Sequence, residues 1–358
     1  MDARAIARWR VRTLRLAGQG HASPEAVVGG LLGVQAENHG QASWAVATRT
    51  NGLTETEFAR RFDAGTVLRT HVLRPTWHFV RPGDIRWLLE LTAPRIRRTF
   101  RLHERELGLD GAAIERSRSV IASSLAADGP LTRAALGERL REAGLPAVNL
   151  ALAVLMADVE LEAIVCSGPL VDGQHTYALL DERAPSARRR DRDEAVAELV
   201  VRYFTGHGPA TERDLTYWAT MTVTDVRAGL AAAGDRLASF EHDGRTYWHG
   251  GEVPDDGPLE PRGHLLQTLD EYHNGYQDSR DVLDVDGIVP RSRRTVGMAL
   301  VDAQMVGGMR RRVEPDRVVF EVELFRGLAP DERAALHDAA ERYGDFLGRS
   351  PELVLSGP

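Results

Sequence analysis

The chain of 358 residues contains no lysine, so all 45 of its basic residues are arginine. Schiff-base catalysis and P-loop phosphate binding both need a lysine. Pyridoxal-phosphate enzymes, lysine-dependent lyases and P-loop nucleotide hydrolases are therefore excluded. We attribute the absence itself mainly to the codon usage of a GC-rich genome. Arginine still matters chemically, because its guanidinium forks onto phosphates and guanine edges better than an ammonium group does.

Cysteine is almost as scarce, with Cys166 as its single instance. One cysteine can form no intramolecular disulfide and cannot alone build a zinc site. It lies in the apolar run 161–166, which predicts a buried small hydrophobic side chain and not a nucleophile.

Long apolar runs are also missing, since no stretch approaches the roughly 18 residues that span a bilayer. The N-terminal residues are studded with arginine and lack the apolar core of a signal peptide. We therefore expect no membrane association and a cytoplasmic location. The net charge of −7 argues against a surface that binds polyanions everywhere, so DNA binding would need locally clustered arginines.

The common catalytic motifs are absent: there is no Gly-x-Ser-x-Gly, His-Glu-x-x-His, Cys-x-x-Cys, or Gly-x-Gly-x-x-Gly after a strand. The glycine-rich run 29–33 lacks a preceding strand, and we expect it to serve close helix packing. The histidines show no metal-ligand spacing, and His71 and His78 are expected to be structural. No metal or cofactor is expected.

The first segment, residues 1–109, shows several helical patterns followed by two short alternating runs, 67–72 and 76–80, with Arg74 and Pro75 at the turn between them. Helices followed by a hairpin are the order of a winged-helix module. An arginine-rich helical pattern over 82–107 completes the segment.

The next two segments, 110–183 and 184–258, resemble copies of each other. Each has a Gly-Pro-x-Thr turn that begins a helix, then a further helix, then an Asp-Gly turn between alternating runs. They predict two more winged-helix modules, and two unrelated helical bundles are the alternative. The basic stretch 183–192 is either a linker or a phosphate-contacting segment.

The last segment, 259–358, is rich in strand patterns, with a clear strand over 318–324 and an amphipathic helix over 331–347. The predicted fold class is therefore α+β and mainly helical. It comprises three tandem winged-helix modules, a small antiparallel β-barrel and a C-terminal helix.

One segment, residues 33–44, breaks the apolar periodicity with crowded polar groups, among them Gln35, Glu37 and Asn38. Side chains at i and i+2 diverge on a helix but share a face when extended. Gln35 and Glu37 could converge only at a helix end or in an extended turn. An isolated Gln-Ala-Glu would by default be a polar helix terminus without function.

The surrounding motifs change that interpretation, because the chain resembles the AlkZ-like DNA glycosylases, also described as a winged-helix DNA-binding family. Members carry Gln-hydrophobic-Gln, or Gln-hydrophobic-Asp in the YcaQ-like branch, where this chain has Gln35-Ala36-Glu37. Further similarities, in family order, are Thr76-Trp77-His78-Phe79-Val80, Gly208-Pro209-Ala210-Thr211 with Trp218, and Leu269-Asp270-Glu271-Tyr272 with Gly275-Tyr276 and Arg280.

The resemblance implies a monofunctional glycosylase that hydrolyses the N-glycosidic bond of N7-alkylated guanine, including bulky or cross-linked adducts, in DNA repair or in self-resistance to a genotoxic natural product. Gln35 and Glu37 are then the catalytic pair, supported by Asn38, Thr76, Trp77 and His78. The partner would be damaged double-stranded DNA. A non-catalytic winged-helix regulator is the alternative, although the chain shows no dimerisation coiled coil and is expected to be a monomer. The arginines expected to contact phosphates are Arg74, Arg97, Arg98, Arg101, Arg291, Arg293 and Arg294.

Overall fold

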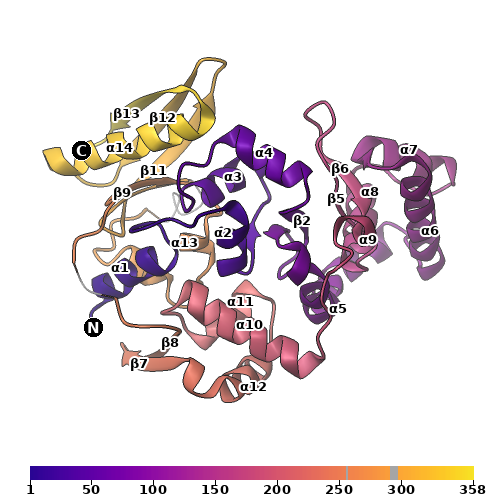
Figure 1. The fold of residues 1–358 in the computed structure, drawn as a ribbon, viewed down its shortest axis with the longest axis horizontal. Helices are drawn as coiled ribbons and strands as arrows, with labels where there is room; N and C mark the ends of the chain where they lie inside the picture. Colours follow the sequence, from indigo (N-terminus) through magenta and orange to yellow (C-terminus); the bar gives the residue numbers. More distant parts are fainter. Residues whose placement is uncertain (255–256, 291–296) are drawn as a thin grey trace. The chain divides into compact units, whose positions relative to one another are not determined.

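The computed structural model describes residues 1–254, 257–290 and 297–358, which form two compact units (Figure 1). The first unit comprises residues 1–58, 197–218 and 222–358, and the second comprises 59–196 with 219–221. Arg291, Arg293 and Arg294 lie outside the described residues, so their expected role stays a prediction.

A five-stranded sheet organises the C-terminal part of the first unit, in the order β13-β12-β11-β10-β9. The strands are β9 (Gly263–Leu266), β10 (Gly297–Val301), β11 (Gln304–Val313), β12 (Arg317–Leu324) and β13 (Ser350–Ser356). The predicted antiparallel barrel is wrong in one respect, because β12 and β13 pair in parallel. The reason is the crossover helix α14 (Pro330–Leu347), which returns the chain to the same end of the sheet.

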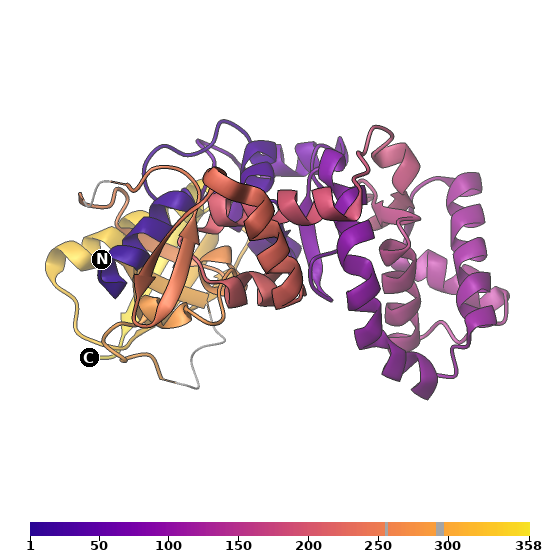
Figure 2. The ribbon, with the colours of Figure 1, turned by 90° about the horizontal axis from the view of Figure 1, so that it is seen from below.

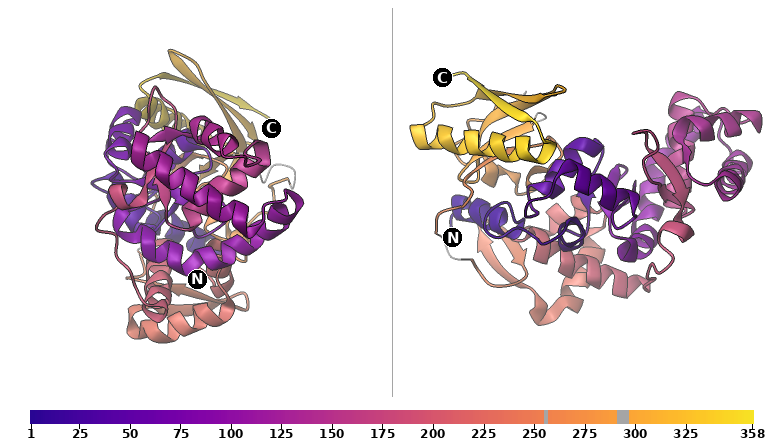
Figure 3. Two further views of the ribbon diagram at one scale, coloured as in Figure 1. Left: turned by 90° about the vertical axis from the view of Figure 1, so that its right-hand side faces the viewer. Right: turned by 45° about the horizontal axis from the view of Figure 1, so that its top comes forward.

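Helix α14 lies across this sheet (Figure 3) and buries its apolar side. Tyr343 of α14 stacks on Trp44, with ring centroids 4.0 Å apart and planes at 12°. The indole Nε1 of Trp44 donates to the Leu265 carbonyl of β9 at 2.8 Å. These contacts fix the helix that carries Trp44 against the sheet.

The N-terminal elements of the first unit are α1 (Ala3–Thr13), α2 (Pro24–Gly30), β1 (Val34–Gln35), α3 (His39–Ala47) and the start of α4 (Glu55–Asp63). The side chain of Ser23 caps α2 by accepting from the Ala26 amide. Gly206 packs closely against the glycine-rich run, because a Cβ on Gly206 would lie 2.4 Å from the Gly30 carbonyl oxygen, whereas a Cβ on Gly30 itself would meet His21 only at 3.4 Å.

The middle of the chain adds further elements to the first unit. They are the end of α10 (Arg192–His207), α11 (Glu212–Trp218), α12 (Val223–Ala233), the 3₁₀ turns η1 (Gly234–Arg236) and η2 (Arg280–Leu283), strands β7 (Ala238–His242) and β8 (Arg245–His249), and α13 (Glu271–Asn274). Asp243 and Gly244 both have positive φ, so the predicted Asp-Gly hairpin turn is confirmed.

The second unit contains the β2 (Leu68–His71) and β3 (Trp77–Val80) hairpin and packs its helices side by side (Figure 2). Its other elements are α5 (Pro82–Glu106), α6 (Gly111–Asp128), β4 (Leu131–Thr132), α7 (Arg133–Glu142), α8 (Asn149–Leu161), β5 (Val165–Ser167), β6 (Thr176–Leu179) and α9 (Leu180–Arg183). Cys166 is fully buried on β5, as predicted, and this burial raises the pKa of its thiol to about 12.

Two features are absent from residues 1–254, 257–290 and 297–358. No helix there is both long and apolar enough to cross a membrane. Within the same residues, no group of three or more His, Cys, Asp or Glu side chains is arranged to hold a metal ion.

Candidate active site

The Gln-Ala-Glu triplet lies in an extended segment that leads into a helix. Gln35 ends β1, and Asn38 is the N-cap of α3, accepting from the Gln41 amide at 3.0 Å. Glu37 therefore directly precedes the N-cap residue of this helix. Of the two arrangements expected from the sequence, the structure has the extended one. Gln35 is buried at 5% exposure, whereas Glu37 is exposed.

Gln35 is held at both its backbone and its side chain by α13. The Asn274 side-chain amide donates to Gln35 Oε1 at 2.9 Å, and the Gln35 backbone amide donates to Glu271 Oε1 at 2.9 Å. With the carbonyl end engaged by Asn274, the amide orientation of Gln35 is set by the protein.

Glu271 is a buried carboxylate that collects three donors. Its Oε2 accepts from Trp218 Nε1 at 2.8 Å and lies 3.2 Å from His207 Nε2, and all three side chains are fully buried. With Glu271 as a carboxylate, which only accepts hydrogen bonds, the His207 tautomer that satisfies this contact is the one with its proton on Nε2. A buried charge is tolerated when its oxygens are satisfied in this way.

The neighbouring residue Asp270 fixes the far end of α3. Arg49, just beyond that helix, donates to both Asp270 oxygens, at 2.6 and 3.0 Å, and both side chains are buried. Asp270 also caps α13 by accepting from the Tyr272 amide at 2.9 Å. Adjacent carboxylates of α13 thus anchor β1 and α3, the two elements that flank Glu37.

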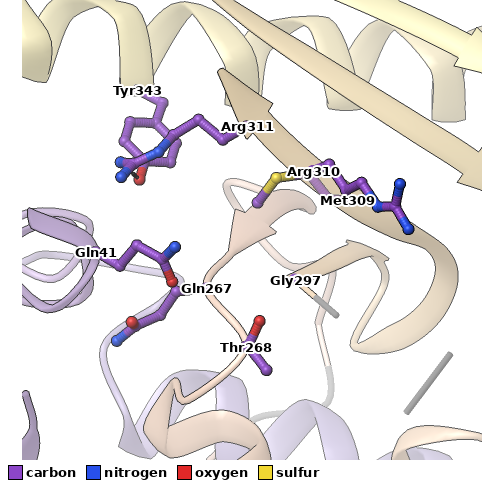
Figure 4. A pocket seen from close by; sticks show the side chains of 8 residues that line it. All are labelled: Gln41, Gln267, Thr268, Gly297, Met309, Arg310, Arg311 and Tyr343. Atoms are coloured by element: carbon purple, nitrogen blue, oxygen red, sulfur yellow. Dashed lines mark hydrogen bonds between the residues drawn. The ribbon is translucent and has the colours of Figure 1, made fainter. Parts of the chain in front are cut away.

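A cavity of about 360 Å³ borders the first turn of α3 (Figure 4). Gln41 of that turn faces it together with Gln267 and Thr268, which follow β9. Arg311 of β11 hydrogen-bonds the Tyr343 hydroxyl on its wall. The described lining residues include guanidinium and amide groups but no acidic side chain, so the cavity favours a polar or anionic ligand.

Comparison with known proteins shows to which family this chain belongs. The sequence matches the family model described as "DNA glycosylase AlkZ-like" over residues 28–346. The chain belongs to the AlkZ-like DNA glycosylase family. It is therefore an enzyme, a DNA glycosylase, and the prediction of family and enzyme class is confirmed.

Two individual proteins are similar to this glycosylase. An interstrand DNA cross-link repair glycosylase of Streptomyces sahachiroi is 25% identical over 321 residues, which cover 83% of this chain and 82% of the relative. The solved structure of the Streptomyces sahachiroi DNA glycosylase AlkZ superposes with a TM-score of 0.82 at 21% identity, over 100% of both chains. The latter shows that the mixed helix and sheet fold is shared.

The glycosylase places Thr76, Trp77 and His78, predicted to support the motif, on or next to β3 of the second unit. Trp77 Nε1 donates to Glu160 Oε1 at 3.2 Å, and His71 Nδ1 also hydrogen-bonds the Glu160 carboxylate. His78 Nδ1 lies 3.0 Å from the Thr76 carbonyl. Both histidines are buried and bonded, which fits the structural role predicted for them.

The arginines proposed to contact phosphates differ in accessibility. Arg74 is buried, at 7% exposure, and its contact with phosphate stays a prediction. Arg97 pairs with Glu162 at 2.7 Å. Arg98 and Arg101 are exposed on α5, where a phosphate could reach them.

Four residues around the motif were not predicted from the sequence as parts of the site: Glu271, Asn274, His207 and Arg49. Asp270 and Glu271 were noted only as part of a motif that resembles the family. The sequence does contain one signal for them, the two adjacent acids before Tyr272. This segment has no amphipathic helix pattern that would place such charges on an exposed face.

Proposed function

We propose that this glycosylase hydrolyses the N-glycosidic bond of N7-alkylated guanine in double-stranded DNA, with Glu37 as general base and Gln35 as the group that positions water or the lesion. The observation that carries the proposal is the pairing of a held amide with an exposed carboxylate two residues away. Gln35 is buried and bonded by α13, while the side chain of Glu37 is exposed.

The chemistry follows from the charge on the damaged base. Alkylation at N7 makes the base cationic, so it can leave without being protonated. As the C1′–N9 bond breaks, its electron pair neutralises the base, and the sugar gains oxocarbenium-like charge that a carboxylate stabilises. Water then bonds to C1′ and passes its proton to Glu37. Since the chain has no lysine, no lysine Schiff base can follow, and the product is an abasic site.

The finer assignment of the substrate also belongs to this proposal. The relative from Streptomyces sahachiroi is named for interstrand cross-link repair, which supports bulky or cross-linked guanine adducts as substrates here too. Repair of such adducts would serve self-resistance to a genotoxic natural product. We further propose that segments 1–109, 110–183 and 184–258 are winged-helix modules that hold the duplex, and that 259–358 forms the sheet domain.

The test uses a labelled duplex with one N7-methylguanine, incubated with stoichiometric protein and then treated with alkali to reveal abasic sites. We expect single-turnover cleavage by the native protein, and a rate constant about 10²- to 10⁴-fold lower for Glu37→Ala, as for other general bases. The matched control is Glu341→Ala, which removes an exposed glutamate on α14. Absence of product from the native protein would refute the proposal, as would full activity of Glu37→Ala.

Family membership disfavours the alternative of a non-catalytic regulator. The same assay separates the two, because a regulator would bind one undamaged sequence tightly and release no base. Electrophoretic mobility shifts on undamaged duplexes of several sequences give that readout.

A further inference from the structure

The second unit contains a cavity of about 390 Å³ that the motif does not use. It is bounded by α5 and by the segment that leads into α10. Its floor includes the buried Trp87 and Leu91, and its walls include Arg95 and Arg98 from α5 and Arg190 and Arg192 from the basic stretch. Two arginine-rich segments that are distant in sequence thus meet around one hollow.

The charges around this hollow are unevenly compensated. Its acidic lining residue, Glu90, is already held by Arg189 at 2.6 Å. Arg190 pairs with Glu194, and its guanidinium lies over the Trp87 ring, 5.7 Å from the centroid. The two nearby acids, Glu90 and Glu194, are therefore each already paired with an arginine other than Arg95 and Arg98.

Arg95 and Arg98 form no hydrogen bond or ion pair with the residues that the structure describes. Three positions apart on α5, they lie on one face of the helix, where like charges destabilise each other. Two adjacent cations beside an apolar floor, with no acid bonded to them, create a local positive potential that favours an anion from outside the chain.

We infer that this cavity binds a backbone phosphodiester of the DNA. The planar guanidinium fork matches phosphate oxygens in two-point contacts, and the apolar floor limits competition from water. This inference rests on the proposed function in one respect, namely that the phosphate belongs to DNA. Gln35 and Glu37 belong to the first unit, so this site makes the second unit a DNA-binding body that contributes neither proposed catalytic group.

The experiment measures binding of a fluorescein-labelled, undamaged duplex by fluorescence anisotropy at several salt concentrations. The full-length double variant Arg95→Ala/Arg98→Ala is compared with Arg116→Ala/Arg333→Ala, which removes the same charge from two exposed positions outside the cavity. We expect about tenfold weaker binding for the first variant. The slope of log affinity against log salt should become less steep by about 1.8, because each phosphate contact contributes about 0.9. The control should stay within about twofold of the native protein.

A second arm titrates inorganic phosphate and follows thermal unfolding, to distinguish a free anion from the DNA backbone. If phosphate stabilises the native protein through Arg95 and Arg98 while DNA affinity is unchanged in the double variant, the site serves a free anion and the inference is overturned. Equal losses in both double variants overturn it as well. Undamaged DNA is bound without chemistry, so these outcomes are independent of whether Glu37 catalyses hydrolysis.

Discussion

Two regions of this glycosylase treat charge in opposite ways. Around α13, the buried carboxylates of Asp270 and Glu271 have their donors supplied by the protein itself. Around α5, Arg95 and Arg98 line a cavity whose acidic residue, Glu90, is paired with Arg189 instead. An ion inside a protein needs partners from the protein, whereas an ion at the surface can take its partners from solution. The first kind of charge therefore stabilises the fold, and the second kind is available to bind a ligand.

A third buried acid in the first unit follows the same rule as the α13 pair. Asp214 accepts from the Thr211 amide at 3.0 Å and from the Gln277 and Asp278 amides at 2.8 Å. The fully buried Arg10 lies 3.9 Å away. Each of these three acids thus has its partners within the protein: arginine and backbone amides for Asp270 and Asp214, and Trp218, His207 and one backbone amide for Glu271.

Removal of one of these acids gives the largest expected effect on stability. Glu271→Ala would leave the donors of Trp218, His207 and the Gln35 backbone without their acceptor, and we expect a loss of about 3–5 kcal/mol in the free energy of unfolding. Urea denaturation followed by circular dichroism measures it. Glu341→Ala, at an exposed position, serves as the control, and a loss below about 1 kcal/mol for Glu271→Ala would break the comparison.

Acidification tests an uncompensated group in the same unit, His264 of β9. Burial, with Arg342 and Arg49 as lesser causes, lowers the pKa of His264 to about 3. As the pH falls below about 6.5, this histidine is therefore protonated in the unfolded chain but stays neutral in the folded chain. Its contribution is complete above pH 6.5 and is lost as the pH falls. Between pH 7.5 and 5 the loss is about 2 kcal/mol.

The variant His264→Phe isolates this group from the other titrating residues. We expect its free energy of unfolding, measured in urea at both pH values, to fall by about 2 kcal/mol less than that of the native protein. Parallel pH dependence of the two proteins would show that His264 titrates normally in the fold.

The smallest effect is expected at the α5 cavity, where the comparison predicts that charge does not support the fold. Arg95→Ala/Arg98→Ala removes two like charges at i and i+3, so the free energy of unfolding should stay the same or rise by about 0.2–0.5 kcal/mol. Urea denaturation at low salt measures it. Destabilisation by more than 1 kcal/mol would mean that these arginines stabilise the helix.

Local patterns in the sequence predicted much of the fold. Periodicity placed the long helix that became α5 (Pro82–Glu106), the strand that became β12 (Arg317–Leu324), and the hairpin that carries Trp77. These elements are defined by residues close in sequence, so the apolar spacing within each one was sufficient.

The supports of the candidate site could not be predicted in the same way. The hydrogen bond from Gln35 to Glu271 joins residues 236 positions apart, and that between Asn274 and Gln35 joins residues 239 apart. No periodicity encodes a single long-range contact. The parallel β12–β13 pair was missed for a related reason, since strand direction depends on how α14 crosses the sheet.

The contrast between Gln35 and Glu37 has a consequence for how such enzymes diverge. Position 35 is tied to α13 through both backbone and side chain, and its exchange would remove the side-chain contact with Asn274 while leaving the backbone bond to Glu271. Position 37 projects from the same segment with an exposed side chain. The side chain at position 37 can therefore diverge at a lower cost to folding than the buried side chain at position 35, whose exchange removes the hydrogen bond with Asn274.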